Sequence, residues 1–163
     1  MNIDTVNARI RDRLSVEWLT PSQFAVWESI HRFDGPPHKV ISIFGTEGTG
    51  KTFLGWLMER EKYASYTLWS ETPKPVLPRL VLDDAVSDRS STRALRPLVD
   101  EMGIRQIILL SRVRVDEPSM PAFQLRVTDD DLACCRANLF RYLKLVIPEG
   151  DSRNFTEMLE LLK

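Results

Sequence analysis

The sequence predicts an α/β fold of three layers, with a mainly parallel central sheet and helices on both faces. Three observations predict it. The apolar run 40–44 leads directly into a glycine-rich turn and then into a helical pattern over 53–58. Two further apolar runs, 80–82 and 106–110, indicate buried strands. A helical stretch separates them, and strands that alternate with helices are typical of a parallel sheet.

The bulk composition is typical of one soluble domain. The chain has 163 residues, of which 43% are hydrophobic and 28% are charged. A net charge of −1 gives no support for nucleic-acid binding. No apolar run reaches membrane-spanning length, and the polar start lacks the apolar core of a signal peptide. The only cysteines, Cys134 and Cys135, are neighbours and make neither a disulfide framework nor a zinc site, so we expect a cytoplasmic protein without a membrane contact.

The first 38 residues are expected to form a helical segment. Residues 1–14 have a weak helical pattern, and a clearer helix begins with a capping box from Thr20 to Gln23. The turn-forming stretch 34–37 ends that helix. Its apolar face is predicted to contain Phe24, Trp27, Ile30 and His31. Trp18, Leu19 or Phe24 could also contact a nucleotide base, although packing in the core is the favoured role for each.

Residues 45–52 match the phosphate-binding loop pattern G-x-x-x-x-G-K-[ST] between a strand and a helix. Its glycines let backbone N–H groups point at phosphate oxygens, and the following helix adds its positive N-terminal end. Lys51 is predicted to reach the β- and γ-phosphates, and the Thr52 hydroxyl to hold Mg²⁺. The expected nucleotide-binding residues are Gly45, Thr46, Glu47, Gly48, Thr49, Gly50, Lys51, Thr52 and Phe53.

The next strand, expected at 66–69, is followed by the proline-rich stretch 71–78, which excludes a normal helix. A parallel crossover usually needs about a dozen residues or more. Only residues 70–79 are available, so we expect this strand to be a poorly formed edge or to run antiparallel.

Leu80-Val81-Leu82-Asp83-Asp84 is an apolar strand that ends in two acids. Downstream of a phosphate loop, this pattern predicts that Asp83 binds Mg²⁺, directly or through water. Asp84 is placed to orient and deprotonate an attacking water, although Asp is shorter than Glu and could position the water poorly.

The second half of the chain is predicted to add two strands and three helices. After a polar loop at 87–91, a helix at 92–102 is bent or started late by Pro97 and is stopped by Gly103. The strand 106–111 precedes Arg112, which is either a γ-phosphate contact or a surface arginine. A strand at 123–127 leads to a helix that Thr128 caps. Its three acids, 129–131, are better explained by capping than by a metal site. Leu132, Cys135, Leu139 and Leu143 form its buried face, and Ser152 caps a short last helix.

The order of these motifs resembles the nucleotide-binding core of STAND NTPases, the NB-ARC-like branch of the AAA+-like P-loop ATPases. Residues 45–52 match the family's GxxGxGKT element, and 80–84 match its LVLDD element. Residues 109–112 resemble its LLTTR element, and 125–140 look like its closing element. The resemblance covers 40–143. It implies a three-layer P-loop NTPase fold, ATP or ADP with Mg²⁺, slow hydrolysis used as a switch, and Arg112 as the γ-phosphate sensor.

The chain also departs from this family. The stretch between the second strand and Asp83 is much shorter than the family's, and no Gly-Arg-Glu element is found near 18–21. The winged-helix and repeat domains that normally follow have no room after Lys163. We therefore expect one domain over 1–163, with a helical segment at 1–38, a nucleotide-binding core at 39–143 and a C-terminal helix at 144–163.

Several functions remain open. The preferred one is a slow Mg²⁺-dependent ATPase that acts as a switch on a protein partner or by self-association, with Lys51, Asp84 and Arg112 as its catalytic residues. A non-hydrolysing regulatory subunit is the alternative, and a small-molecule kinase is less favoured because no arginine-rich lid is present. The absence of a Lys-x-Asp motif disfavours a GTPase, and the charge gives no support for a DNA-loading protein. Candidate arginine fingers for a neighbouring subunit are Arg89, Arg93, Arg96 and Arg114.

Overall fold

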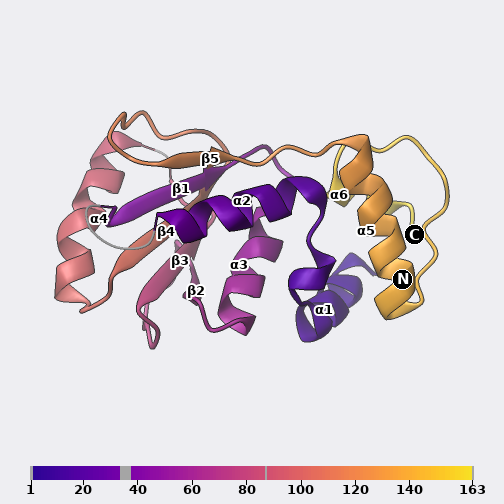
Figure 1. The fold of residues 1–163 in the computed structure, drawn as a ribbon, viewed down its shortest axis with the longest axis horizontal. Helices are drawn as coiled ribbons and strands as arrows, with labels where there is room; N and C mark the ends of the chain where they lie inside the picture. Colours follow the sequence, from indigo (N-terminus) through magenta and orange to yellow (C-terminus); the bar gives the residue numbers. More distant parts are fainter. Residues whose placement is uncertain (1, 34–37, 87, 163) are drawn as a thin grey trace.

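The computed structural model describes residues 2–33, 38–86 and 88–162. A five-stranded sheet forms the middle layer (Figure 1), and its strands lie in the order β2-β3-β4-β1-β5 with every pair parallel. The predicted α/β fold with a parallel sheet is therefore confirmed. The strands are β1 (Val40–Phe44), β2 (Ser65–Leu68), β3 (Arg79–Asp83), β4 (Gln106–Ser111) and β5 (Ala122–Gln124).

Helices cover both faces of the sheet because successive strand residues point to opposite sides. On one face α2 (Pro21–Arg32) and α3 (Lys51–Arg60) share a core with Ile41, Ile43, Val81, Ile108 and Leu110. On the other face α4 (Arg89–Glu101) shares a second core with Val40, Leu80, Leu82, Ile107 and Leu109. These two cores make the three predicted layers.

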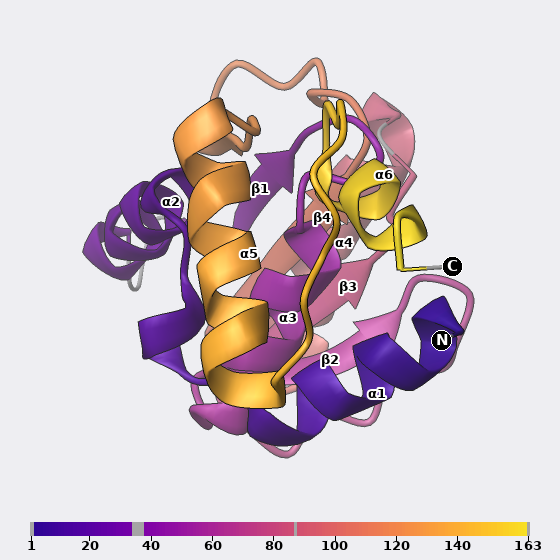
Figure 2. The same ribbon diagram turned by 90° about the vertical axis from the view of Figure 1, so that its right-hand side faces the viewer.

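Three more helices, which belong to the first core, lie at one end of the molecule. Figure 2 shows α1 (Ile3–Arg13), α5 (Asp129–Leu143) and α6 (Phe155–Glu160) around the ends of β1 and β3. The Arg9 guanidinium donates to the Leu143 carbonyl at 2.8 Å, and that of Arg13 donates to the Tyr142 carbonyl at 3.2 Å. Cations at the C-terminal carbonyl groups of a helix satisfy them and complement its dipole. Helix α1 therefore caps α5.

Asp131 joins α5 to α2. Its buried carboxylate accepts hydrogen bonds from the Ser22 N–H at 2.8 Å and the Ser22 hydroxyl at 2.6 Å. It also accepts from the N–H and the hydroxyl of Thr128, each at 2.8 Å. Burial by itself raises the pKa of Asp131, but the bonds from Ser22 and Thr128 outweigh it and the net pKa is lowered. The capping box with Thr128 confirms the predicted capping role of Asp131. Asp129 and Asp130 are exposed.

The second strand differs from the expectation in one respect. β2 is a short edge strand, as one alternative held, but it runs parallel to β3 and the antiparallel alternative is wrong. The crossover has no helix, and residues 69–78 connect the two strands as turns and irregular backbone. The Ser65 hydroxyl oxygen accepts from the N–H groups of Val76 and Leu77 at 3.0 and 3.1 Å, so the connection lies against the start of β2. Because β2 and β3 are short, residues 69–78 are enough to bring the chain back to the start of a parallel strand.

Other boundaries also moved. Helix α4 begins at Arg89 because Asp88 caps it through the Ser91 N–H at 2.8 Å, and it continues through Pro97. Gly103 follows it with a φ of +65°, as a helix stop requires. Asn154, not Ser152, caps the last helix by accepting from the Glu157 N–H at 2.9 Å. β5 is shorter than the expected strand 123–127.

The buried face of α2 is also rotated from the predicted one. Its buried residues are Gln23, Val26 and Ile30, while Phe24 and His31 are exposed. The capping-box bond from the Thr20 N–H to the Gln23 side-chain oxygen forms at 3.1 Å and faces Gln23 inward. The predicted stop at 34–37 lies outside the described residues, as does Ser87 of the predicted polar loop. Among the helices described, none is long and apolar enough to cross a membrane.

Candidate functional site

The phosphate loop begins where β1 meets its two neighbouring strands. The Gly45 N–H donates to the Ser111 carbonyl at 3.1 Å, which ties the loop to the end of β4. A Cβ at Gly45 would lie 2.4 Å from the Leu125 carbonyl oxygen and 2.9 Å from the Thr49 hydroxyl. Only glycine fits here, because the backbone after β5 passes directly against the loop.

The loop curls around its lysine. Gly48 and Gly50 have φ angles of +75° and +84°, which glycine adopts without strain. The Lys51 ammonium donates to the carbonyls of Gly45 at 2.6 Å and Thr46 at 2.8 Å. Burial lowers the pKa of Lys51, and the charge of Asp83 opposes that shift. A half-buried cation that rests on backbone carbonyls can turn to a phosphate anion.

Asp83, at the end of β3, accepts three hydrogen bonds and is only 4% exposed. Its Oδ2 accepts from the Thr52 hydroxyl at 2.7 Å and from the Tyr66 hydroxyl at 2.6 Å. Its Oδ1 accepts from the Asp84 N–H at 2.8 Å. Burial, followed by the hydrogen bond to Asp83, raises the pKa of Tyr66, so its phenol stays protonated and donates. Lys51, Thr52, Tyr66 and Asp83 are called the inner wall below.

The inner wall fits Mg²⁺. The Thr52 hydroxyl gives its hydrogen to Asp83, so its own oxygen keeps lone pairs for a cation. Hydroxyl and carboxylate oxygens are ligands that this hard cation prefers. In the described part of the chain, no three His, Cys, Asp or Glu side chains form a metal cluster. Thr52 and Asp83 would therefore hold the cation together with phosphate oxygens.

Glu47, Asp84 and Arg112 form a second group, called the outer rim, around the same end of the sheet. Their side chains are 73%, 77% and 66% exposed. The Arg112 guanidinium lies 3.6 Å from a Glu47 carboxylate oxygen and 4.0 Å from one of Asp84. Asp84 has a φ of +56°, the left-handed region, which its short polar side chain tolerates. The predicted catalytic residues Asp84 and Arg112 thus meet in a loose cluster at the surface.

Both groups border one cavity of about 800 Å³, a size that suits a nucleotide. Predicted residues 47–53 all line it, as do Asp83, Asp84 and Arg112. Gly45 and Thr46 are not in its lining; they contribute the carbonyls that hold Lys51. The remaining walls come mostly from residues distant in sequence, among them Asn7, Arg11, Trp18, Thr20, Gln23, Glu71, Asn138, Phe155 and Thr156.

Helix α6 closes the cavity beside the glycines. The Phe155 N–H donates to the Gly48 carbonyl at 2.9 Å. A Cβ at Gly48 would lie 2.4 Å from the Asn154 side-chain oxygen, and one at Gly50 would lie 2.4 Å from the Gln23 side-chain nitrogen. Sequence reasoning missed Gln23, Tyr66, Asn154 and Phe155. Gln23 and Asn154 are of residue types that cap helices, which is a usable local signal. No sequence pattern linked any of the four residues to the phosphate loop.

Of the three candidate base contacts, Trp18 lines the cavity and Leu19 packs in the core. Trp18 stacks on Tyr142 with ring centroids 4.7 Å apart. Phe24 is 44% exposed and does not line the cavity, so the prediction that it packs in the core is wrong. Burial raises the pKa of Cys135 to about 12, which agrees with a packing role for that thiol.

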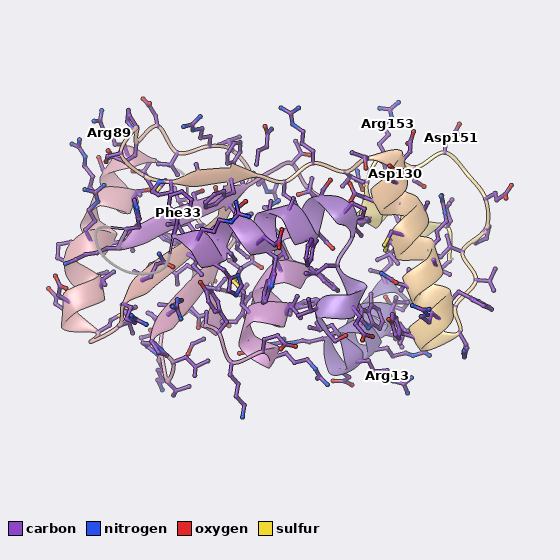
Figure 3. All side chains as sticks on the ribbon, viewed as in Figure 1. Arg13, Phe33, Arg89, Asp130, Asp151 and Arg153 are labelled. Carbon is purple, nitrogen blue, oxygen red and sulfur yellow. The ribbon has the colours of Figure 1, made fainter. Side chains whose placement is uncertain are left out.

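Three of the four candidate arginine fingers contact residues outside the cavity. Arg93 and Arg89 lie 3.1 and 3.7 Å from the buried Glu117 carboxylate, and Arg96 donates to the Ser119 hydroxyl at 3.0 Å. Figure 3 shows Arg89 at the far end of the long axis from α5 and α6. None of these three residues lines the cavity, and Arg114 does not line it either.

Comparisons with known proteins place the fold. No family model matches the sequence, and no curated protein matches it. Several solved structures do match, among them two that are each 14% identical in sequence. The replication initiator DnaA bound to AMPPCP and single-stranded DNA matches with a TM-score of 0.58, over 85% of this chain and 58% of that one. AMPPCP-bound DnaA from Aquifex aeolicus matches with a TM-score of 0.59, over 86% of this chain and 60% of that one.

At this identity the likeness concerns the fold alone, which is consistent with a P-loop NTPase-like fold. The chain spans about three fifths of the length of each of these structures. The narrower assignment to STAND proteins is not confirmed.

Proposed function

We propose that the chain binds ATP or ADP with Mg²⁺ and acts as a slow ATPase, a nucleotide switch for a protein partner or for self-association. The observation that carries this proposal is the inner wall: a complete phosphate loop whose Thr52 hydroxyl donates to the buried Asp83, at the edge of a nucleotide-sized cavity that Lys51 also lines. Both structural neighbours were solved with AMPPCP, which supports an adenine nucleotide as the ligand.

Binding would use groups that are already in place. The N–H groups of the loop and the positive end of α3 favour a phosphate anion at 48–52. Lys51 would exchange its two carbonyl contacts for the β- and γ-phosphates. Mg²⁺, held by Thr52 and Asp83, would neutralise charge on the phosphates. The cavity beside Trp18, Thr20 and Asn138 would take the rest of the nucleotide.

Hydrolysis would depend on the outer rim. Asp84 is the residue proposed to orient and deprotonate water, and Arg112 the one proposed to contact the γ-phosphate. Both are mostly exposed, and the closest contact between them is 4.0 Å. Catalytic groups must be held within about 0.5 Å of productive geometry. Slow turnover is therefore expected until a nucleotide or a partner orders the rim.

A non-hydrolysing regulatory subunit is the second candidate, and a specific observation favours it. Arg89, Arg93 and Arg96 contact Glu117 or Ser119 and do not line the cavity, so within this chain they do not reach a γ-phosphate there. Asp84 is short and lies on left-handed backbone. A small-molecule kinase has less support, because no residue of the cavity identifies an acceptor.

The binding half of the proposal is tested with calorimetry. ATP, ADP and GTP are titrated with Mg²⁺ into the parent chain, into Lys51→Ala and into Lys74→Ala. Loss of a charged hydrogen bond of about 1.5–3 kcal/mol predicts roughly 10- to 150-fold weaker ATP binding by Lys51→Ala. Lys74→Ala removes the same charge from an exposed loop and should bind as the parent does. Equal affinity of the parent and Lys51→Ala would show that the phosphate-loop assignment is wrong.

The hydrolysis half is tested by phosphate release from the parent and from Asp84→Ala. Turnover by the parent that Asp84→Ala loses would support the ATPase and the role of Asp84. Tight binding without turnover in either protein would instead favour the regulatory subunit.

A further inference from the structure

The hydroxyl of Tyr66 occupies an acceptor position on the carboxylate that is expected to hold Mg²⁺. A carboxylate oxygen offers about two lone-pair positions. At Asp83 Oδ2, the hydroxyls of Thr52 and Tyr66 occupy both, at 2.7 and 2.6 Å. Sheet register places Tyr66 there, because β2 pairs Leu68 with Asp83 and Tyr66 with Val81.

Packing holds the ring of Tyr66 in this position. Gly55 lies inside α3, where glycine costs about 1 kcal/mol relative to alanine. A Cβ at Gly55 would lie 2.8 and 2.9 Å from two ring carbons of Tyr66. The Arg11 guanidinium lies 5.6 Å from the centre of the same ring. A glycine that leaves room for this ring, and a cation beside it, are independent signs that the phenol has a fixed place.

We propose that Tyr66 is a positioning residue that competes with Mg²⁺ for the Asp83 carboxylate; this inference rests on the proposed nucleotide site. The Thr52 bond must persist, because it frees the Thr52 oxygen for the cation. Mg²⁺ that bound at Oδ2, directly or through water, would therefore have to displace the phenol. Without the cation, the same phenol holds the buried carboxylate in place.

The test uses Tyr66→Phe, which removes one oxygen and keeps the ring. ADP affinity is measured by calorimetry at a series of Mg²⁺ concentrations, for the parent and for the variant. Association of Mg²⁺ with free ADP is common to both, so a difference reports on the protein. Removing one competing hydrogen bond to a charged group should lower the Mg²⁺ concentration at half-effect by about tenfold.

Tyr142→Phe is the matched control. Its hydroxyl also donates to a carboxylate, that of Glu17 at 3.2 Å, and Tyr142 is not part of the cavity lining. This variant should show the Mg²⁺ dependence of the parent.

A second readout is measured on the parent chain, and Tyr66→Phe serves only to assign the Tyr66 signal. The chain has three tyrosines, so labelling with 3-fluorotyrosine should give three ¹⁹F resonances, of which Tyr66→Phe removes one. Addition of Mg²⁺ to the ADP complex should shift the Tyr66 resonance and leave those of Tyr63 and Tyr142 unchanged.

The outcomes separate the two proposals. An equal or higher Mg²⁺ requirement in Tyr66→Phe, or a Tyr66 resonance that Mg²⁺ leaves unchanged, would overturn the role of Tyr66 alone. A parent chain that binds no ADP at any Mg²⁺ concentration would overturn the nucleotide site and the role of Tyr66 together.

Discussion

The inner wall and the outer rim border the same cavity, but they are organised differently. In the inner wall, Thr52, Tyr66 and Asp83 are joined by hydrogen bonds of 2.6 and 2.7 Å around a buried carboxylate. In the outer rim, Asp84 and Arg112 are mostly exposed and 4.0 Å apart. The groups expected to bind a nucleotide are thus held without one, whereas those expected to hydrolyse it are not.

The reason lies in what supports each group. The inner-wall residues extend from β2, β3 and the first turn of α3, which pack together in the sheet and the first core. Asp84 and Arg112 are the first residues after β3 and β4, where pairing ends. Val86 and Val113, which follow them closely, are exposed as well. Substitutions in the inner wall and in the elements that support it should therefore have large effects on stability and nucleotide binding, and substitutions in the outer rim should have small ones.

The largest effect on stability is expected at Asp131, which joins α5 to α2, two helices of the first core. Asp131→Ala would remove a buried carboxylate and leave the donors of Ser22 and Thr128 without their acceptor. Loss of a buried charged partner predicts a fall in the free energy of unfolding of about 3–5 kcal/mol. Urea denaturation measures it. Asp130→Ala is the control, because Asp130 lies in the same first turn, at the surface (Figure 3), and should cost less than about 1 kcal/mol.

The next effect concerns the phosphate loop itself. Gly45→Ala would place a Cβ 2.4 Å from the Leu125 carbonyl oxygen, and such overpacking costs about 1–3 kcal/mol. Unfolding experiments should show this loss, and calorimetry should show weaker ADP binding. Gly103→Ala is the comparison for ADP binding. No atom lies within 4 Å of its added Cβ, so its cost comes from its φ of +65° and not from a contact with the loop. If Gly45→Ala bound ADP as tightly as Gly103→Ala does, the close backbone approach would have no role in the site.

A smaller effect should appear as a pH dependence. The pKa of Asp131 is lowered from its ordinary value of 3.8, so its charged form stabilises the fold. That contribution is complete above the ordinary value and is lost as the pH falls through the lowered pKa. The difference in unfolding free energy between the parent and Asp131→Ala should therefore narrow below about pH 4. A constant difference down to pH 2 would contradict the lowered pKa.

The smallest effects are expected at the outer rim. Asp84→Asn and Arg112→Ala each break a long contact between exposed groups, which contributes about 1 kcal/mol or less. ADP affinity, measured by calorimetry, should change less than about fivefold in either variant. Phosphate release from ATP should fall in both. A tenfold loss of ADP affinity would show that the rim is already organised for binding, and the comparison with the inner wall would fail.

Many elements of the fold could be predicted from the sequence. The glycines and Lys51 of the loop, the strand that ends in Asp83 and the Thr128 cap are each defined within a few residues of chain. Such patterns work because turn conformation, helix capping and strand periodicity depend on near neighbours. The phosphate loop, its position between strand and helix, and the acid opposite it were therefore available from the sequence by itself.

Only the tertiary structure decided which distant residues complete the site. β2 pairs with β3 in the parallel direction, and the register of that pairing brings Tyr66 to Asp83. Docking of α6 brings Phe155 to Gly48, and the contact between α2 and α5 brings Ser22 to Asp131. Sheet register and helix docking are set by packing between layers, which no local pattern specifies. The sequence thus determined the loop and its acid, and packing across the layers selected the partners that hold them.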